Sequence, residues 1–134
     1  MTTRRTLLCS ASLLLNQVVK AQPKGGNGII FEHDLPDLTL NDWSVTALEV
    51  SYKPGESTPA HRHPGITIAY VLEGEIRSKV GDQPEKTYTA GQMFLETPGQ
   101  MHSVSRNGSN SRPAKLLAVV LTKKGAQLTT FTQG

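Results

Sequence analysis

The sequence has one cysteine, few aromatic residues and no long apolar run. Cys9 lies in an apolar segment near the N-terminus, so the rest of the chain offers neither a disulfide partner nor a thiol nucleophile. A membrane-spanning helix needs about 20 consecutive apolar residues, and the sequence holds no such run. Outside the N-terminal region no segment shows the 3.6-residue apolar period of a long amphipathic helix. These absences argue against a disulfide scaffold, a thiol enzyme and a helical bundle.

The first 21 residues have the pattern of an export signal. Arg4 and Arg5 precede a short apolar run at 7–15, and Val19 and Ala21 supply small residues before Gln22. We expect residues 1–21 to be a cleaved signal peptide and the protein to be periplasmic or secreted. The paired arginines resemble a twin-arginine signal, which exports folded proteins. An ordinary Sec-type signal remains an alternative, because a single arginine pair does not separate the two routes.

The excess of basic residues belongs mostly to this signal. The whole chain has 14 lysines and arginines against 11 aspartates and glutamates. Removal of Arg4, Arg5 and Lys20 with the signal would leave 11 basic and 11 acidic side chains. A balanced chain lacks the basic surface of a nucleic-acid-binding protein. We therefore expect a small-molecule ligand, no nucleic-acid partner, and no membrane contact once the signal is removed.

The remaining chain reads as one all-β domain. Residues 43–52 alternate in polarity, with Leu48, Val50 and Tyr52 on one face, as in a half-buried strand. Similar short runs are separated by turns rich in glycine and proline, and the expected strands span 43–52, 66–72, 76–80, 85–88, 92–96, 102–106 and 115–121. This spacing predicts a barrel or sandwich at 41–122, with a lead-in at 22–40 and a loose polar tail at 123–134.

Three of the four histidines suggest a metal site. His61 and His63 are two residues apart, so on a strand both imidazoles project to one face. His102 begins another expected strand after a turn. Two imidazoles from one strand and one from a neighbour would form a facial site for Zn, Cu, Fe or Ni. Taken alone, the His61–His63 pair could equally be exposed in a proline-rich loop.

Glycines and histidines recur in two groups with fixed spacing: Gly55, His61, His63 and Gly74, then Gly91, Pro98, Gly99 and His102. This pattern resembles the two conserved motifs of the cupin superfamily, over roughly residues 40–121. The resemblance implies a cupin-type jelly-roll β-barrel, commonly a homodimer. It also implies one divalent metal ion (Mn, Fe, Ni, Zn or Cu) inside the barrel, held by His61, His63 and His102.

The sequence departs from that pattern at Thr67, where cupins usually carry a glutamate ligand. Three interpretations stay open: a three-histidine site with free coordination positions, a substitute carboxylate, or weak or absent metal binding. Glu96 is the best substitute, because Gln92, Phe94 and Glu96 share a strand face that leads to His102. Glu96 could instead be an ordinary surface glutamate at a strand end.

Two further side-chain groups are interpreted from strand parity. Arg106 is an even number of residues from His102 and so should lie on the same strand face. It is therefore expected at the pocket mouth, where it could bind a substrate carboxylate. A solvated surface arginine is the alternative. The expected interior is mainly apolar: Leu48, Val50, Ala69, Val71, Phe94 and Val104. Ile66, Ile68, Tyr70 and Leu72 share one face of their strand and would either pack under the second sheet or form a dimer interface.

These features predict a metal-dependent enzyme that acts on a small polar molecule outside the cytoplasm. Its reaction would be of the dioxygenase, isomerase, decarboxylase or lyase type, because the fold hosts all of these. Glu96 would act as general base or extra ligand, and Arg106 as a second catalytic candidate. The alternatives are a non-catalytic module that binds a metal or small ligand, and a structural cupin without metal.

Overall fold

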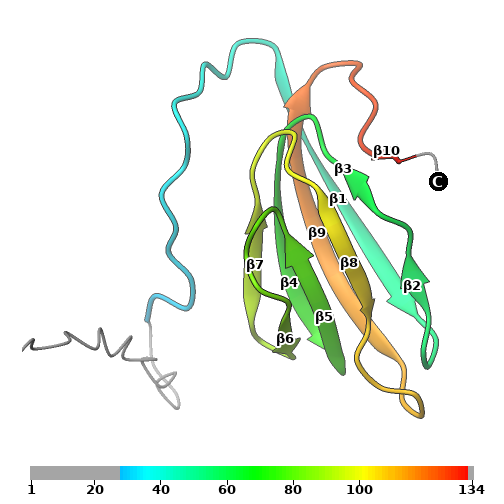
Figure 1. The fold of residues 1–134 in the computed structure, drawn as a ribbon. Coiled ribbons are helices and arrows are strands. Elements are labelled where there is room, and N and C mark those ends of the chain that lie inside the picture. The colour runs from blue at the N-terminus through cyan, green and yellow to red at the C-terminus, as the bar shows by residue number, and fades with distance from the viewer. Residues whose placement is uncertain (1–27, 133–134) are drawn as a thin grey trace, which may run out of the picture.

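The computed structural model describes residues 28–132, drawn in colour in Figure 1. The expected signal peptide at 1–21 lies outside this range. All regular elements between residues 28 and 132 are β-strands, which confirms the predicted all-β class. Within this range no helix is long and apolar enough to cross a membrane.

The strands form two antiparallel sheets. The first has the order β1-β9-β4-β7, with bounds Trp43–Tyr52, Ala114–Lys123, Ile66–Glu73 and Met93–Glu96. The second has the order β10-β3-β8-β5-β6, with bounds Thr130–Phe131, His61–Arg62, His102–Asn107, Glu75–Val80 and Lys86–Thr89. The short strand β2 (Ser57–Thr58) pairs with β8.

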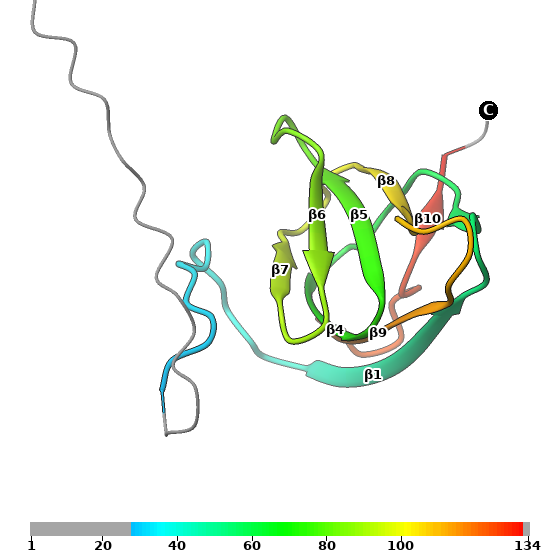
Figure 2. The ribbon, with the colours of Figure 1, turned by 90° about the horizontal axis from the view of Figure 1, so that it is seen from below.

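The two sheets face each other and enclose the interior, as the view in Figure 2 shows. Burial alternates along β9 because successive side chains point to opposite faces of a strand. The inward residues of β9 meet those of β1 and β4 and the facing sheet to form the core: Tyr52, Ala69, Val71, Ile76, Phe94, Ala114, Leu116 and Ala118. Several of these core side chains, among them Ala69, Leu116 and Ala118, also line a cavity between the two sheets.

The outer face of the first sheet is largely apolar. Ala47, Val119, Ile68 and Leu95 lie in one row across its four strands. Thr67 and Ala69 line the cavity between the sheets, so Ile68, which lies between them on β4, points away from the second sheet. Of the two placements expected for these residues, packing under the second sheet is therefore wrong for Ile68.

The turn between β4 and β5 requires a glycine. Gly74 has a φ of 69°, and a Cβ at this position would lie 2.5 Å from the carbonyl oxygen of Pro113. Only glycine combines a positive φ with such a close backbone approach at low cost. The turn thereby sets the second sheet against the first.

The C-terminal residues do not form the loose tail that the sequence suggested. Thr130 and Phe131 form β10, which pairs with Arg62 and His61 of β3. The backbone N–H and the side-chain hydroxyl of Thr132 both donate hydrogen bonds to the carbonyl of Ala60, at 3.0 Å each. The chain thus returns over β3, beside the histidine pair.

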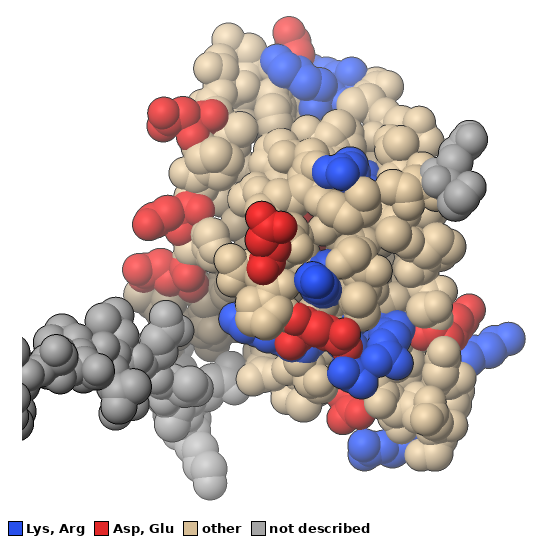
Figure 3. Space-filling view, viewed as in Figure 1, with Lys and Arg blue, Asp and Glu red and all other residues tan. Residues whose placement is uncertain are grey.

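Acidic and basic side chains are interspersed on the face in Figure 3. The ion pairs of the outer surface join single neighbouring side chains. Glu85 contacts Arg77 at 2.6 Å and Arg106 at 3.5 Å, and Lys115 contacts Glu49 at 2.9 Å. Exposed pairs of this kind contribute about 0–1 kcal/mol each, so the fold depends mainly on the apolar interior.

Candidate metal centre

Three imidazoles converge inside the barrel. His61 on β3 is the direct cross-strand partner of His102 on β8, and their ring centroids are 4.9 Å apart. His63 lies just beyond β3, with its ring centroid 5.0 Å from that of His61. All three side chains are buried. The exposed-loop interpretation of the His61–His63 pair is therefore wrong.

Backbone carbonyls fix the protonation pattern of two rings. His61 Nδ1 lies 2.8 Å from the carbonyl oxygen of Pro59, and His63 Nδ1 lies 2.7 Å from that of Leu128. A carbonyl oxygen only accepts, so each Nδ1 donates its hydrogen and each Nε2 of the neutral ring keeps a free lone pair. Burial is the main cause that lowers the pKa of His61 and favours its neutral form. Metal-binding histidines usually have such a carbonyl partner.

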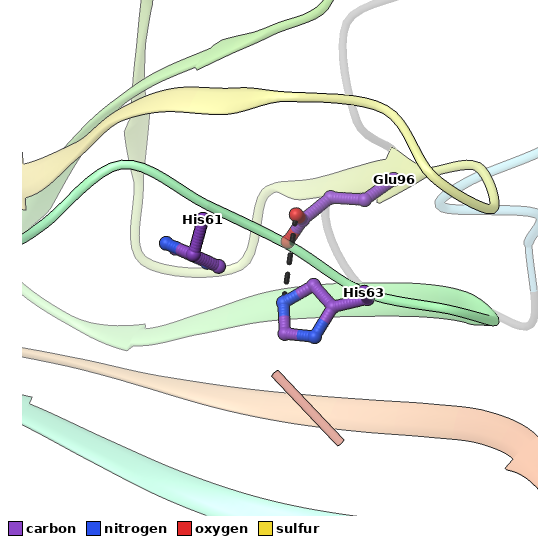
Figure 4. A group of neighbouring side chains, drawn as sticks. All are labelled: His61, His63 and Glu96. Atoms are coloured by element: carbon purple, nitrogen blue, oxygen red, sulfur yellow. Dashed lines mark ion pairs between the residues drawn. The ribbon is translucent and has the colours of Figure 1, made fainter. Parts of the chain in front are cut away.

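Glu96 joins the imidazoles from the opposite sheet. Its carboxylate oxygen Oε2 lies 3.0 Å from Nδ1 of His102 and 3.6 Å from Nε2 of His63. Figure 4 shows the Glu96 side chain directed toward His61 on β3 and toward His63, which lies just beyond β3. One ligand atom each of His61, His63 and Glu96 lies within 4.8 Å of the others. Glu96 is 4% exposed, so the surface-glutamate interpretation is wrong.

His102 connects to the same group through Glu96. It is not one of the three residues whose ligand atoms lie mutually within 4.8 Å. Its Nδ1 faces the carboxylate, and its Nε2 lies 2.8 Å from the hydroxyl oxygen of Ser78. The ring therefore has one nitrogen toward the centre and the other held by β5.

The centre contains buried polar atoms whose hydrogen-bonding capacity is unsatisfied. Thr67 Oγ1 has no hydrogen-bond partner, and Glu96 Oε2 and His102 Nδ1 lie 3.0 Å apart without forming a hydrogen bond. A buried polar atom without a partner costs about 1–3 kcal/mol. In addition, Nε2 of a neutral His63 and the carboxylate of Glu96 would present lone pairs to each other, which favours a cation between them. Imidazole nitrogen and carboxylate oxygen are suitable ligands for Mn, Fe, Ni, Zn and Cu. The residues present thus fit a divalent metal ion.

Arg106 lies outside the cavity, so its expected placement is wrong. The pairing of β5 with β8 shifts register between Lys79 and Val80, as at a β-bulge. A bulge adds one residue to a strand and reverses the facing of everything beyond it. Ser105 consequently points inward, whereas Arg106 points outward and contacts Glu85. The same shift removes Val104 from the cavity wall.

The histidines and Glu96 line a cavity of about 200 Å³. The cavity is lined by Leu48, Val50, Tyr52, Thr58, His61, His63, Thr67, Ala69, Phe94, Glu96, His102, Ser105, Leu116, Ala118, Val120, Thr129 and Phe131. Four of the expected apolar interior residues line it, namely Leu48, Val50, Ala69 and Phe94. Sequence reasoning missed the hydroxyls of Thr58 and Ser105, and the C-terminal pair Thr129 and Phe131.

The cupin domain pattern matches residues 48–120, more than half of the chain. The chain belongs to the cupin family. No curated protein matches the sequence. Among solved structures, this cupin is similar to the DMSP lyase DddQ from Ruegeria pomeroyi DSS-3, at 24% identity and a TM-score of 0.59. That alignment covers 69% of this chain and 44% of DddQ, so this cupin spans less than half of the DddQ chain.

Two other solved structures are nearer in length to this cupin. The protein TT1209 from Thermus thermophilus is 29% identical with a TM-score of 0.54, over 66% of this chain and 81% of its own. A double-stranded β-helix protein from Klebsiella pneumoniae is 23% identical with a TM-score of 0.52, over 72% and 80%. The likeness to DddQ and to the Klebsiella protein shows the fold alone.

In this cupin the carboxylate of the centre comes from Glu96 on β7, one strand away from position 67 on β4, where the cupin pattern usually has a glutamate. Thr67 on β4 and Glu96 on β7 are direct cross-strand partners, and both side chains point inward. Side chains of direct partners lie about 5 Å apart at Cβ. Glu96 can therefore bring its carboxylate to nearly the same part of the cavity that a glutamate at position 67 would reach.

Proposed function

We propose that this cupin is a metal-dependent enzyme that acts on a small polar molecule. The observation that carries the proposal is the convergence of three buried imidazoles and one buried carboxylate, with unsatisfied polar atoms, in the lining of one cavity. Buried ligand-type groups that converge in a concave site are typical of functional centres. The reaction would be of the dioxygenase, isomerase, decarboxylase or lyase type.

The protein side chains have separate tasks in this proposal. His61, His63 and His102 would hold the ion, and Glu96 would be the fourth ligand or a general base. When bound, the metal would polarise a substrate oxygen as a Lewis acid. The Glu96 carboxylate lines the cavity, so as a general base it would accept a proton from a ligand bound there.

The apolar walls strengthen these interactions. Ala69, Phe94 and Ala118 give the cavity that contains the centre part of its apolar wall. Electrostatic interactions are several-fold stronger in such an environment than in bulk water. The volume of about 200 Å³ limits the occupant to a small molecule.

We also propose that the protein works outside the cytoplasm, as a homodimer without a nucleic-acid partner. The export pattern of residues 1–21 supports the location. The apolar row on the outer face of the first sheet, which includes Val119 and Ile68, supports a dimer interface. The interspersed charges of Figure 3 fit a small-molecule ligand better than a nucleic acid.

A turnover assay separates an enzyme from a binding module. Metal-loaded wild type and His102→Ala would be incubated with a panel of small hydroxy acids, oxo acids and sugar derivatives, and conversion followed by NMR. We expect conversion of at least one compound by wild type alone, and open coordination positions facing the cavity in a crystal structure with bound ligand. A saturated coordination shell with no conversion would instead show a non-catalytic module.

A further inference from the structure

The second sheet carries a row of hydroxyl groups next to its histidines. Thr58 on β2 pairs with Ser105 on β8, and Ser105 pairs with Ser78 on β5. Ser78 and Ser105 are buried and point inward. The neighbouring inward row contains the cross-strand pair His61 and His102. The hydroxyl row is thus the next layer of the same wall, directly beside the candidate metal centre.

A tyrosine from the opposite sheet completes this row. Tyr52, at the end of β1, is 4% exposed. Its hydroxyl lies 2.6 Å from Oγ1 of Thr58 and 2.9 Å from Oγ of Ser105. All three residues line the cavity that holds the histidines. We call Tyr52, Thr58 and Ser105 the hydroxyl cluster.

The hydroxyl cluster has more O–H donors than its internal hydrogen bonds use. Each hydroxyl can donate one hydrogen, so the cluster has three. Only two hydrogen bonds join its members, and within residues 28–132 these hydroxyls make no other. Ser78 is different, because its hydroxyl is engaged with His102. At least one O–H of the cluster is therefore available to a ligand in the cavity.

Apart from the histidines of the candidate metal centre, the cavity lining offers no basic side chain. Among the lining residues there is no lysine or arginine. A carboxylate buried beside the hydroxyl cluster would lack a counter-ion, which is costly. An uncharged oxygen that accepts one hydrogen bond carries no such cost. Much of the remaining cavity wall is apolar and includes Leu48, Ala69 and Leu116.

We propose that the hydroxyl cluster is a second binding pole, which takes an uncharged carbonyl oxygen of the substrate. The substrate's other end, a carboxylate, would lie at the metal centre, and a short apolar link would run between them. The substrate class is then a short oxo acid, or the corresponding amide or ester acid. This inference rests on the proposed metal-dependent function.

Matched ligand pairs test the second pole without knowledge of the natural substrate. Zn²⁺-loaded protein would be titrated calorimetrically with 3-oxobutanoate, 4-oxopentanoate and 5-oxohexanoate, each against the fatty acid that lacks the ketone. The three lengths cover different spans across the cavity. One net hydrogen bond corresponds to about fivefold to tenfold in affinity. We expect at least one oxo acid to bind tighter than its partner by this factor.

A triple variant assigns the difference to the hydroxyl cluster. Tyr52→Phe, Thr58→Val and Ser105→Ala together remove the three hydroxyls and keep most of the side-chain volume. The oxo-acid preference should fall to about onefold, whereas Zn²⁺ stoichiometry stays unchanged. Ser103→Ala is the matched control, because Ser103 is an exposed serine on the outer face of β8, and it should keep the full preference.

A second measurement needs no variant. The ketone carbon of a ¹³C-labelled oxo acid should move downfield when the acid binds to wild type, because its oxygen accepts a hydrogen bond. Equal affinities within every pair, an unshifted ketone resonance, or a preference that survives in the triple variant would overturn the second pole alone. Absence of Zn²⁺ binding by wild type would instead overturn the proposed function.

Discussion

The two walls of the cavity differ in chemistry. The wall from the second sheet carries imidazoles and hydroxyls, among them His61, His102 and Ser105. The wall from the first sheet is apolar over most of its area and contributes a single carboxylate, that of Glu96. One sheet thus supplies most of the polar groups, while the other supplies most of the apolar wall. The difference teaches that the first sheet contributes to the site through a few side chains, namely Glu96 and the hydroxyls of Tyr52 and Thr67.

The largest expected effect comes from the polar wall. His61→Ala should lower the affinity for a divalent metal by at least about 100-fold, because it removes a ligand that the fold has already oriented. Isothermal titration with Zn²⁺ measures the change. His33→Ala is the control, since His33 is an exposed histidine of the lead-in. An equal loss in both variants would contradict the assignment.

The carboxylate is tested by moving it between strands. Glu96→Thr should weaken metal binding by about 10–100-fold, because the centre loses its carboxylate. The double variant Thr67→Glu with Glu96→Thr returns a carboxylate from the cross-strand position and should restore most of the affinity. Competitive Zn²⁺ titration with a chromophoric chelator compares the three proteins. The account would fail here if the double variant bound metal no better than Glu96→Thr.

A smaller effect is expected from the C-terminal strand. A chain that ends after Gln127 lacks the Leu128 carbonyl, which accepts the hydrogen of His63 Nδ1. Loss of such a supporting contact typically costs about 10-fold or more in metal affinity. A chain that ends after Thr132 retains β10 and serves as the control. The same metal titration should place the control at wild-type affinity, and a shared defect would count against the role of Leu128.

The smallest effect should be confined to stability. Ile76 is fully buried in the core and does not line the cavity. Ile76→Val should lower the free energy of unfolding by about 1 kcal/mol and leave metal affinity unchanged. Urea denaturation and metal titration of the same preparation measure both quantities. A change in metal affinity would show that the core and the centre are coupled.

The sequence was sufficient to predict which side chains share a strand face wherever the two-residue period of the strand was unbroken. It predicted that His61 and His63 share a face, and that Glu96 faces inward with Phe94, and both pairs line the cavity. It failed for Arg106, because the register shift between Lys79 and Val80 reverses the parity along β8. A bulge leaves no clear mark in a single sequence.

Long-range pairing explains the other omissions. β10 is only two residues long, and its polar sequence resembles a tail until Phe131 is seen opposite His61. The hydroxyl contact of Tyr52 with Ser105 joins residues 53 positions apart. Strand alternation showed only that Tyr52 faces inward, because the partner across the cavity depends on how the two sheets face each other.

The central claim is that the barrel holds one metal ion between its two walls. Its most direct test is the metal content of the protein purified without chelating steps, measured by plasma mass spectrometry and followed by back-titration of the stripped protein. We expect close to one divalent ion per chain, and a rise in melting temperature when the ion is returned. A chain that contains no metal, and whose melting temperature ignores added Mn²⁺, Fe²⁺, Ni²⁺, Zn²⁺ and Cu²⁺, would contradict the claim.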